Sequence, residues 1–235
     1  MVRQPRVQHR RSAVRVPIGD RALHGDLLVP PRPIGVVVFA HGSGSSRHSP
    51  RNQYVAQDLE ERGFATLLID LLSPDEEAID VHTAEYRFDI GLLTERLVMI
   101  IDWMHAGPST QAWPIGIFGA STGGAAALVA ASVRPDEVRA VVSRGGRPDL
   151  SGAALSHCAA PTLLIVGALD QAVLEMNEDA MRRMRGPVSL EIVPGATHLF
   201  EEPGALDRVA QLAGDWFTRY LSPSDSHRGR AEAGE

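Results

Sequence analysis

The chain has 235 residues, 44% of them apolar, and a formal net charge of −6. This length is normal for one α/β domain, and the apolar fraction is sufficient for a sizeable buried core. The negative charge gives no reason to expect a nucleic-acid partner, which would require a basic face. A single cysteine, Cys158, excludes an intrachain disulfide framework and suits a reducing compartment. We therefore expect a cytoplasmic protein.

All 23 positively charged residues are arginines, and the chain contains no lysine. This absence excludes a Walker A loop, Schiff-base chemistry and Ser-Lys catalysis, each of which needs a lysine. No apolar run approaches the roughly 20 residues that span a bilayer, so we expect no membrane partner. Residues 1–12 are predicted to form a disordered basic arm, 13–221 a single domain and 222–235 a disordered tail.

Apolar segments alternate with helical patterns along the chain, which is typical of a mostly parallel sheet covered on both faces. Residues 13–17 and 22–29 read as an antiparallel hairpin that adds to one edge of the sheet. Core strands are predicted at residues 35–40, 65–70, 114–119, 138–142, 162–167 and 189–193. Helices are predicted near residues 50–63, 89–105, 122–133, 173–185 and 203–221, and residues 71–87 as an acidic loop of uncertain structure.

The third core strand is followed by the sequence GASTG at residues 119–123, which fits the G-x-S-x-G pattern between a strand and a helix. In this context the central serine sits on a sharp, strained turn that lifts its hydroxyl above the sheet. The start of the next helix supplies free N–H groups that favour a developing oxyanion. Ser121 is therefore the candidate nucleophile; the alternative is a Gly-rich turn that only packs a helix onto a strand.

Three other strand ends supply the remaining parts of a hydrolytic site. The loop after the first core strand contains His41 and Gly42, and Ser43 would donate its N–H to the oxyanion hole together with that of Thr122. Asp170 follows the fifth core strand and His198 the last one. The order Ser121, Asp170, His198 is the chain order of an α/β-hydrolase triad. Asp170 could instead be a helix N-cap and His198 an ordinary loop histidine, and Asp149 is the nearest rival for the acid.

These motifs resemble the α/β-hydrolase superfamily and, within it, the small, lidless dienelactone hydrolase-like group. The similarity is carried by HGSGSSRHSPRN (41–52), GASTG (119–123), GALD (167–170) and GATH (195–198), and extends from about residue 14 to 221. It implies a serine hydrolase of an ester or lactone that needs no cofactor and no metal. One position departs from the family, because dienelactone hydrolases are known for a cysteine nucleophile where this chain has Ser121. Dienelactone itself is therefore not the expected substrate.

Loop length and arginines bear on specificity. Only about twenty residues separate the fourth and fifth core strands, so we expect an open site without a lid domain, suited to small soluble substrates. Arg47, Arg51, Arg144 and Arg147 gather at the expected rim. One or more of them could hold a carboxylate or phosphate of the substrate, as a bidentate guanidinium does. The alternative is salt bridges to the acidic segment at 75–80 or to Asp149.

Two other functions compete with a hydrolase. Residues 42–47 (GSGSSR) follow a strand, and Asp70 ends the next strand, as in a dinucleotide-binding oxidoreductase, although Arg47 replaces the third glycine of that fingerprint. A non-catalytic small-molecule binding protein on the same fold is the second possibility. His41 and His48 lack the spacing of a metal site. Oligomeric state, and ester against lactone, thioester or peptide, stay open.

Overall fold

The computed structural model describes residues 10–222 and contains an eight-stranded sheet in the order β1-β2-β4-β3-β5-β6-β7-β8. Its strands are β1 (Arg10–Ile18), β2 (Arg21–Val29), β3 (Val36–Ala40), β4 (Ala65–Ile69), β5 (Ile115–Ala120), β6 (Val138–Arg144), β7 (Thr162–Gly167) and β8 (Val188–Val193). Strands β3 to β8 pair in parallel, and β2 runs antiparallel to β4. The predicted α/β-hydrolase fold is confirmed, with each predicted core strand in its place.

The N-terminal hairpin is longer than the sequence indicated. Strand β1 pairs antiparallel with β2 from Arg10 opposite Val29 to Ile18 opposite Arg21. Residues 10–12, which we assigned to a disordered arm, therefore belong to the sheet, because the ladder to β2 satisfies their backbone groups. The remainder of the predicted arm, residues 1–9, and residues 223–235 of the predicted tail lie outside the described residues.

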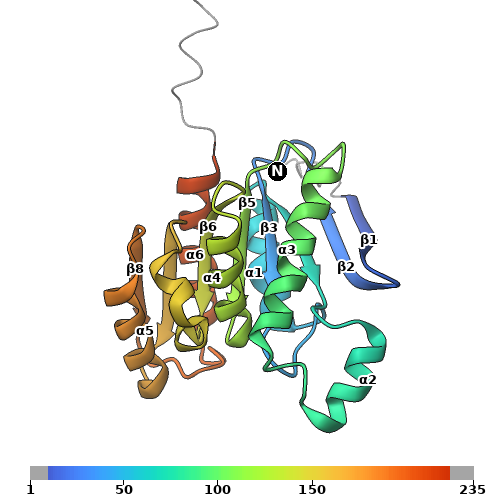
Figure 1. The fold of residues 1–235 in the computed structure, drawn as a ribbon. Coiled ribbons are helices and arrows are strands. Elements are labelled where there is room, and N and C mark those ends of the chain that lie inside the picture. Colours follow the sequence, from blue (N-terminus) through green and yellow to red (C-terminus); the bar gives the residue numbers. More distant parts are fainter. Residues whose placement is uncertain (1–9, 223–235) are drawn as a thin grey trace, which may run out of the picture.

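Helices cover both faces of the sheet (Figure 1). The described helices are α1 (Pro50–Glu61), α2 (Pro74–Thr83), α3 (Ile90–Ala106), α4 (Thr122–Val133), the 3₁₀ segment η1 (Pro148–Ser156), α5 (Gln171–Arg183) and α6 (Ala205–Leu221). One core cluster joins α3, α4 and part of α5 to the sheet, and a second joins α1 and α6 to its other face. Because β3 to β7 are largely buried between these layers, their side chains reach solvent mainly at the strand ends.

The segment expected to be an acidic loop, residues 71–87, contains α2, so that prediction was wrong. Ser73 and Glu76 form a capping box, in which the Ser73 hydroxyl accepts from the Glu76 amide and the Glu76 carboxylate accepts from the Ser73 amide. Pro74 occupies the first turn, and three acidic residues there complement the helix dipole. The capping residues were visible in the sequence, but the apolar periodicity that usually identifies a helix was weak.

A buried ion pair fixes the chain between α2 and α3. The Asp80 carboxylate is 1% exposed and accepts from the backbone amides of Tyr86 and Arg87, at 2.7 and 3.0 Å, and from Arg87 Nε at 2.6 Å. Burial alone would raise the pKa of Asp80, but these hydrogen bonds and the Arg87 charge outweigh it and hold the pKa below its ordinary value. The pair also holds Arg87 beside the loop that follows β3, where a Cβ added at Gly44 would lie 3.5 Å from Arg87 Nη1.

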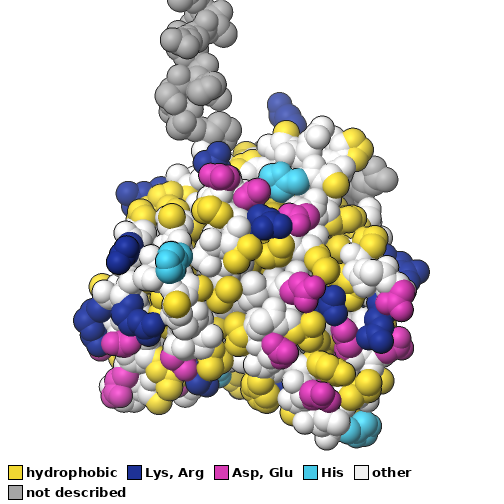
Figure 2. All heavy atoms as spheres, in the orientation of Figure 1, with side chains coloured by type: hydrophobic (Ala, Val, Ile, Leu, Met, Phe, Trp, Pro, Cys, Tyr) yellow, Lys and Arg dark blue, Asp and Glu magenta, His cyan; other side chains and the backbone are white. Residues whose placement is uncertain are grey.

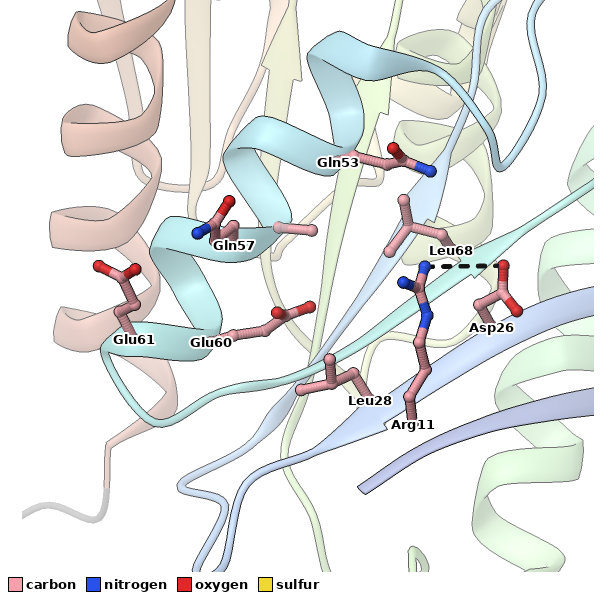
Figure 3. A pocket seen from close by; sticks show the side chains of 9 residues that line it. Arg11, Asp26, Leu28, Gln53, Gln57, Glu60, Glu61 and Leu68 are labelled. Atoms are coloured by element: carbon pink, nitrogen blue, oxygen red, sulfur yellow. Dashed lines mark ion pairs between the residues drawn. The ribbon is translucent and has the colours of Figure 1, made fainter. Parts of the chain in front are cut away.

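The surface carries charges of both signs. Figure 2 shows basic and acidic side chains interspersed on the face formed by α3, α4 and α5. On the other side of the sheet, a groove of about 370 Å³ runs between α1 and β2, lined by Gln53, Glu61 and Leu28 among others, with Arg11 paired to Asp26 in it (Figure 3). Within residues 10–222, no helix is long and apolar enough to cross a bilayer.

We predict that Asp80→Asn lowers the free energy of unfolding by about 2 kcal/mol, because it removes the charge that accepts three buried hydrogen bonds. Urea unfolding at neutral pH measures the loss. Asp102→Asn is the matched control: Asp102 also pairs with one arginine, Arg134, but its side chain is 55% exposed. Exposed pairs contribute at most about 1 kcal/mol, so the control should lose less.

The pH dependence of this difference follows from the lowered pKa of Asp80. A carboxylate with a lowered pKa stabilises the fold above its unfolded-state pKa, and that stability is lost as the pH falls through its lower folded-state pKa. The gap between wild type and Asp80→Asn should therefore narrow in acid. Equal losses in the two variants at neutral pH would contradict a special role for the buried pair.

Candidate active site

Ser121 lies at the turn between β5 and α4 with φ 51° and ψ −119°. This backbone conformation is rare for a residue with a side chain and is associated with functional turns. The flanking glycines permit it: a Cβ added at Gly123 would lie 2.2 Å from the Ala40 carbonyl oxygen, and one at Gly119 would lie 2.6 Å from the Gly123 oxygen. The G-x-S-x-G pattern thus follows from the close approach of the start of α4 to β3 and β5.

The loop after β3 passes directly beside this serine. A Cβ added at Gly42 would lie 3.1 Å from Ser121 Cβ, which places the loop backbone against the nucleophile. The Ser43 amide, expected to point into an oxyanion hole, donates to Thr122 Oγ1 at 2.9 Å. Thr122 is the first residue of α4, so its own N–H has no partner in a preceding helical turn. The sequence did not indicate that the Thr122 hydroxyl would bridge the two predicted oxyanion residues.

His41 anchors the same loop. Its Nε2 accepts from the Leu71 amide at 3.0 Å, and its Nδ1 lies 3.0 Å from the Gly42 carbonyl oxygen, so Nδ1 carries the proton. Burial lowers the pKa of His41, in keeping with this neutral tautomer. Both ring nitrogens are therefore engaged by the backbone. In residues 10–222, no group of three or more His, Cys, Asp and Glu side chains is placed to hold a metal ion.

The candidate acid and base meet above the ends of β7 and β8. Asp170 follows β7, and its Oδ2 lies 2.6 Å from Nδ1 of His198, in the loop after β8. Asp170 makes no side-chain capping bond to α5, so its carboxylate is directed at the histidine rather than at the helix. The rival acid, Asp149, instead accepts two hydrogen bonds from Arg147, at 2.9 and 2.8 Å. The His198 side chain is 39% exposed, whereas that of Asp170 is 16% exposed.

One turn, residues 144–147, joins the serine to the histidine. The Ser121 amide donates to the Arg144 carbonyl oxygen and the Arg147 amide to the Ser121 carbonyl oxygen, both at 3.2 Å. Between them Gly145 has φ +52°, and a Cβ there would lie 3.4 Å from the His198 ring. Asn177, fully buried on α5, supports this turn by donating to the Gly146 carbonyl oxygen at 3.0 Å. Sequence reasoning missed Asn177, whose only signal was a polar residue within the helix.

The four rim arginines do not behave alike. Arg47 pairs with Asp70 and, at 3.6 Å, with Asp26. Arg51 pairs with Glu201 at 3.0 Å, and Arg147 with Asp149. Three of the four are therefore in salt bridges, and none of their partners lies in the segment 75–80.

Arg144 is the exception. It is 7% exposed and lies against the Phe200 ring, 5.7 Å from the ring centroid. Its Nε and Nη1 are buried and have no hydrogen-bond partner among the described residues. Buried polar groups are nearly always paired, so this side chain stands out.

Asp70, the acid that a dinucleotide-binding oxidoreductase would need, is already bonded within the protein. In a nucleotide-binding fold Asp70 would bind a ribose, but here one of its oxygens accepts from the Arg47 amide at 2.7 Å and the other pairs with the Arg47 guanidinium. The carboxylate thus holds the loop after β3 in place. Beside this loop lies a cavity of about 330 Å³ lined by His24, Leu72 and Glu77 among others, at the carboxyl ends of β3 and β4.

Several known proteins are similar to this chain in sequence and structure. Two Mycobacterium tuberculosis proteins, provisionally named phosphoribosyl transferases, are each 56% identical over 212 residues, which is 90% of this chain and 47% of theirs. The chain thus spans about half their length. A dienelactone hydrolase of Anabaena variabilis is 58% identical, with a TM-score of 0.90 over 91% of this chain and 99% of that one.

A more distant structure shares the fold alone. Est1E of Butyrivibrio proteoclasticus, bound to ferulic acid, is 16% identical, with a TM-score of 0.75 over 89% of this chain and 99% of that one. The model of the dienelactone hydrolase family matches residues 23–222, which include Ser121, Asp170 and His198. This chain therefore belongs to the dienelactone hydrolase family.

Proposed function

We propose that this chain is a serine hydrolase that cleaves an ester or a related acyl bond of a small, soluble substrate through an acyl-enzyme. Its family supports hydrolase activity in general. The observation that carries the finer proposal is the strained Ser121 at the head of α4, joined by the turn at 144–147 to a histidine that is hydrogen-bonded to Asp170. These parts lie at one edge of the sheet, which is where ligands bind in open α/β folds.

The first step is attack by Ser121 Oγ on the acyl carbon. Asp170 accepts from Nδ1–H of His198, which leaves Nε2 of the ring as the lone pair that takes the serine proton. The negative Asp170 then stabilises the imidazolium. When the tetrahedral intermediate collapses, the bond to the leaving group breaks and His198 returns the proton to it. A water molecule, activated by the same histidine, releases the acid and restores Ser121.

The oxyanion of the intermediate would form at the N-terminus of α4. There the Thr122 amide is unpaired within the helix and the helix dipole favours negative charge. The Thr122 hydroxyl accepts from Ser43 N–H, so its own proton is free to point at the oxyanion. In this arrangement Thr122 donates to the oxyanion from both its backbone amide and its hydroxyl. In the alternative arrangement the Thr122 side chain rotates away, and the Ser43 amide donates to the oxyanion instead.

The phosphoribosyl transferase name belongs to proteins of which this chain covers 47%. That name describes the whole of a longer protein, whereas the elements described above in this chain are those of a hydrolase.

We predict that Ser121→Ala abolishes both covalent labelling by a fluorophosphonate probe and turnover of p-nitrophenyl acetate. Cys158→Ala is the control, because cysteine is the nucleophile expected of this family and Cys158 is the one thiol of the chain. Burial raises the pKa of the Cys158 thiol, so it stays protonated and unreactive. Labelling that survives in Ser121→Ala would show that another residue is the nucleophile, whereas wild type that is not labelled at all would favour a non-catalytic binding protein.

Asp170→Asn should lower kcat by about a thousandfold or more, because an asparagine cannot hold the histidine tautomer or stabilise the imidazolium. Asp149→Asn should change kcat little, since Asp149 is engaged by Arg147. Steady-state kinetics on p-nitrophenyl acetate measure both. The reverse order of effects would transfer the role of the acid to Asp149.

Thr122→Val should lower kcat by about a hundredfold with a small change in KM, because it removes a hydrogen-bond donor or the group that positions one. Thr122→Ser keeps the hydroxyl and should retain most activity. Pre-steady-state measurement of acylation separates this effect from product release. A fully active valine variant would show that the Thr122 hydroxyl plays no part in stabilising the oxyanion.

A further inference from the structure

Arg144 is the last residue of β6 and lies next to the nucleophile in the sheet. It is the register partner of Ala120, and its carbonyl oxygen accepts from the Ser121 amide at 3.2 Å. Its side chain extends toward the loop that carries His198, where the guanidinium meets the ring of Phe200. Phe200 is itself buried and has a positive φ of 57°, a strained conformation two residues after the histidine.

The guanidinium has no counter-ion. Within residues 10–222, no carboxylate lies within 4.0 Å of it, although Arg47, Arg51 and Arg147 at the same edge each have one. Its Nε and Nη1 are both buried and unbonded. The ring of Phe200 offsets only a part of the lost hydration, because a cation–π contact supplies no acceptor for these N–H groups.

The positive charge of Arg51 makes the unpaired charge of Arg144 more unfavourable. Burial and, to a smaller extent, the nearby charge of Arg51 together lower the pKa of Arg144 to about 10. The side chain still carries its charge at neutral pH. A buried, unpaired cation destabilises a fold, and its uncompensated charge attracts an anion.

We infer that Arg144 determines specificity by binding an anionic group of the substrate, a carboxylate or a phosphate, with its guanidinium. This inference rests on the proposed function, because it places the anion beside the bond that Ser121 attacks. The guanidinium fork matches the two oxygens of either anion. Because Arg144 is largely buried, the anion would be bound with little water around it, where charge discriminates strongly between substrates.

Kinetics with matched esters test the inference. Mono-p-nitrophenyl succinate and p-nitrophenyl butyrate have acyl chains of equal length, but only the first carries a carboxylate. The pair 4-acetoxybenzoate and its methyl ester moves the charge to the leaving group. We expect wild type to prefer the charged member of at least one pair. Arg144→Met should reduce that preference at least about tenfold, mainly through KM.

Arg139→Met is the matched control, because Arg139 lies on the same strand but is exposed near its opposite end. It should leave the preference for charged esters unchanged. If Arg144→Met slows the charged and neutral esters of both pairs equally, or if wild type shows no preference for charge, the inference is overturned.

Binding without turnover separates this inference from the proposed function. Succinate and inorganic phosphate are titrated calorimetrically into Ser121→Ala, with and without Arg144→Met. Heat from either anion that disappears in the double variant supports the inference even if Ser121 were not the nucleophile, and the two titrations tell carboxylate from phosphate. If neither anion binds, or if binding survives Arg144→Met, the inference fails.

Thermal unfolding distinguishes a binding role from a structural one. Methionine fills a similar volume without an unpaired charge, so Arg144→Met should raise Tm if the arginine is kept for a ligand. A lower Tm together with equal losses on charged and neutral esters would assign Arg144 to the core instead.

Discussion

The left-handed backbone of Ser121 is the constraint on which the rest of the site depends. A residue with a side chain is stable there only because its neighbours hold it on every side: α4 presses against β3 and β5 through glycines, and the turn at 144–147 bonds to both the amide and the carbonyl of Ser121. The same turn carries Gly145 against His198. One set of backbone contacts therefore fixes the nucleophile and limits where the base can lie.

Around Ser121, several charged and polar side chains hold the neighbouring loops in place by hydrogen bonds. Asp70 holds the loop after β3 through the backbone and side chain of Arg47, and Asp80 holds the approach to α3 through Arg87. His41, neutral and buried, links the first of these loops to the end of β4. Loops placed by such internal bonds keep an open site ordered without a lid domain.

The sequence predicted what depends on local pattern and chain order. Apolar runs identified the core strands, and the G-x-S-x-G pattern predicted the strained turn at Ser121, the candidate nucleophile. It missed α2, because that helix rests on a capping box and a buried ion pair more than on an apolar face. The sequence also could not predict which rim arginines are paired. Arg47 pairs with Asp26, twenty-one residues earlier, and Arg51 pairs with Glu201, which lies 150 residues later in the chain. Ion pairing between distant segments is a property of the fold, not of the local sequence.

The contrast among these arginines bears on how such a site selects its substrate. A paired arginine is neutralised before any ligand arrives, so binding an anion there must first break an existing bond. An unpaired arginine has no ion pair to break before it binds a ligand, and a buried one has already lost its hydration in the folded protein. The free-energy cost of removing water from Arg144 is thus already part of the folded state, so an anion that binds there does not have to overcome it. In the inference drawn for Arg144, preorganisation of this kind is what would favour a charged ester over a neutral one.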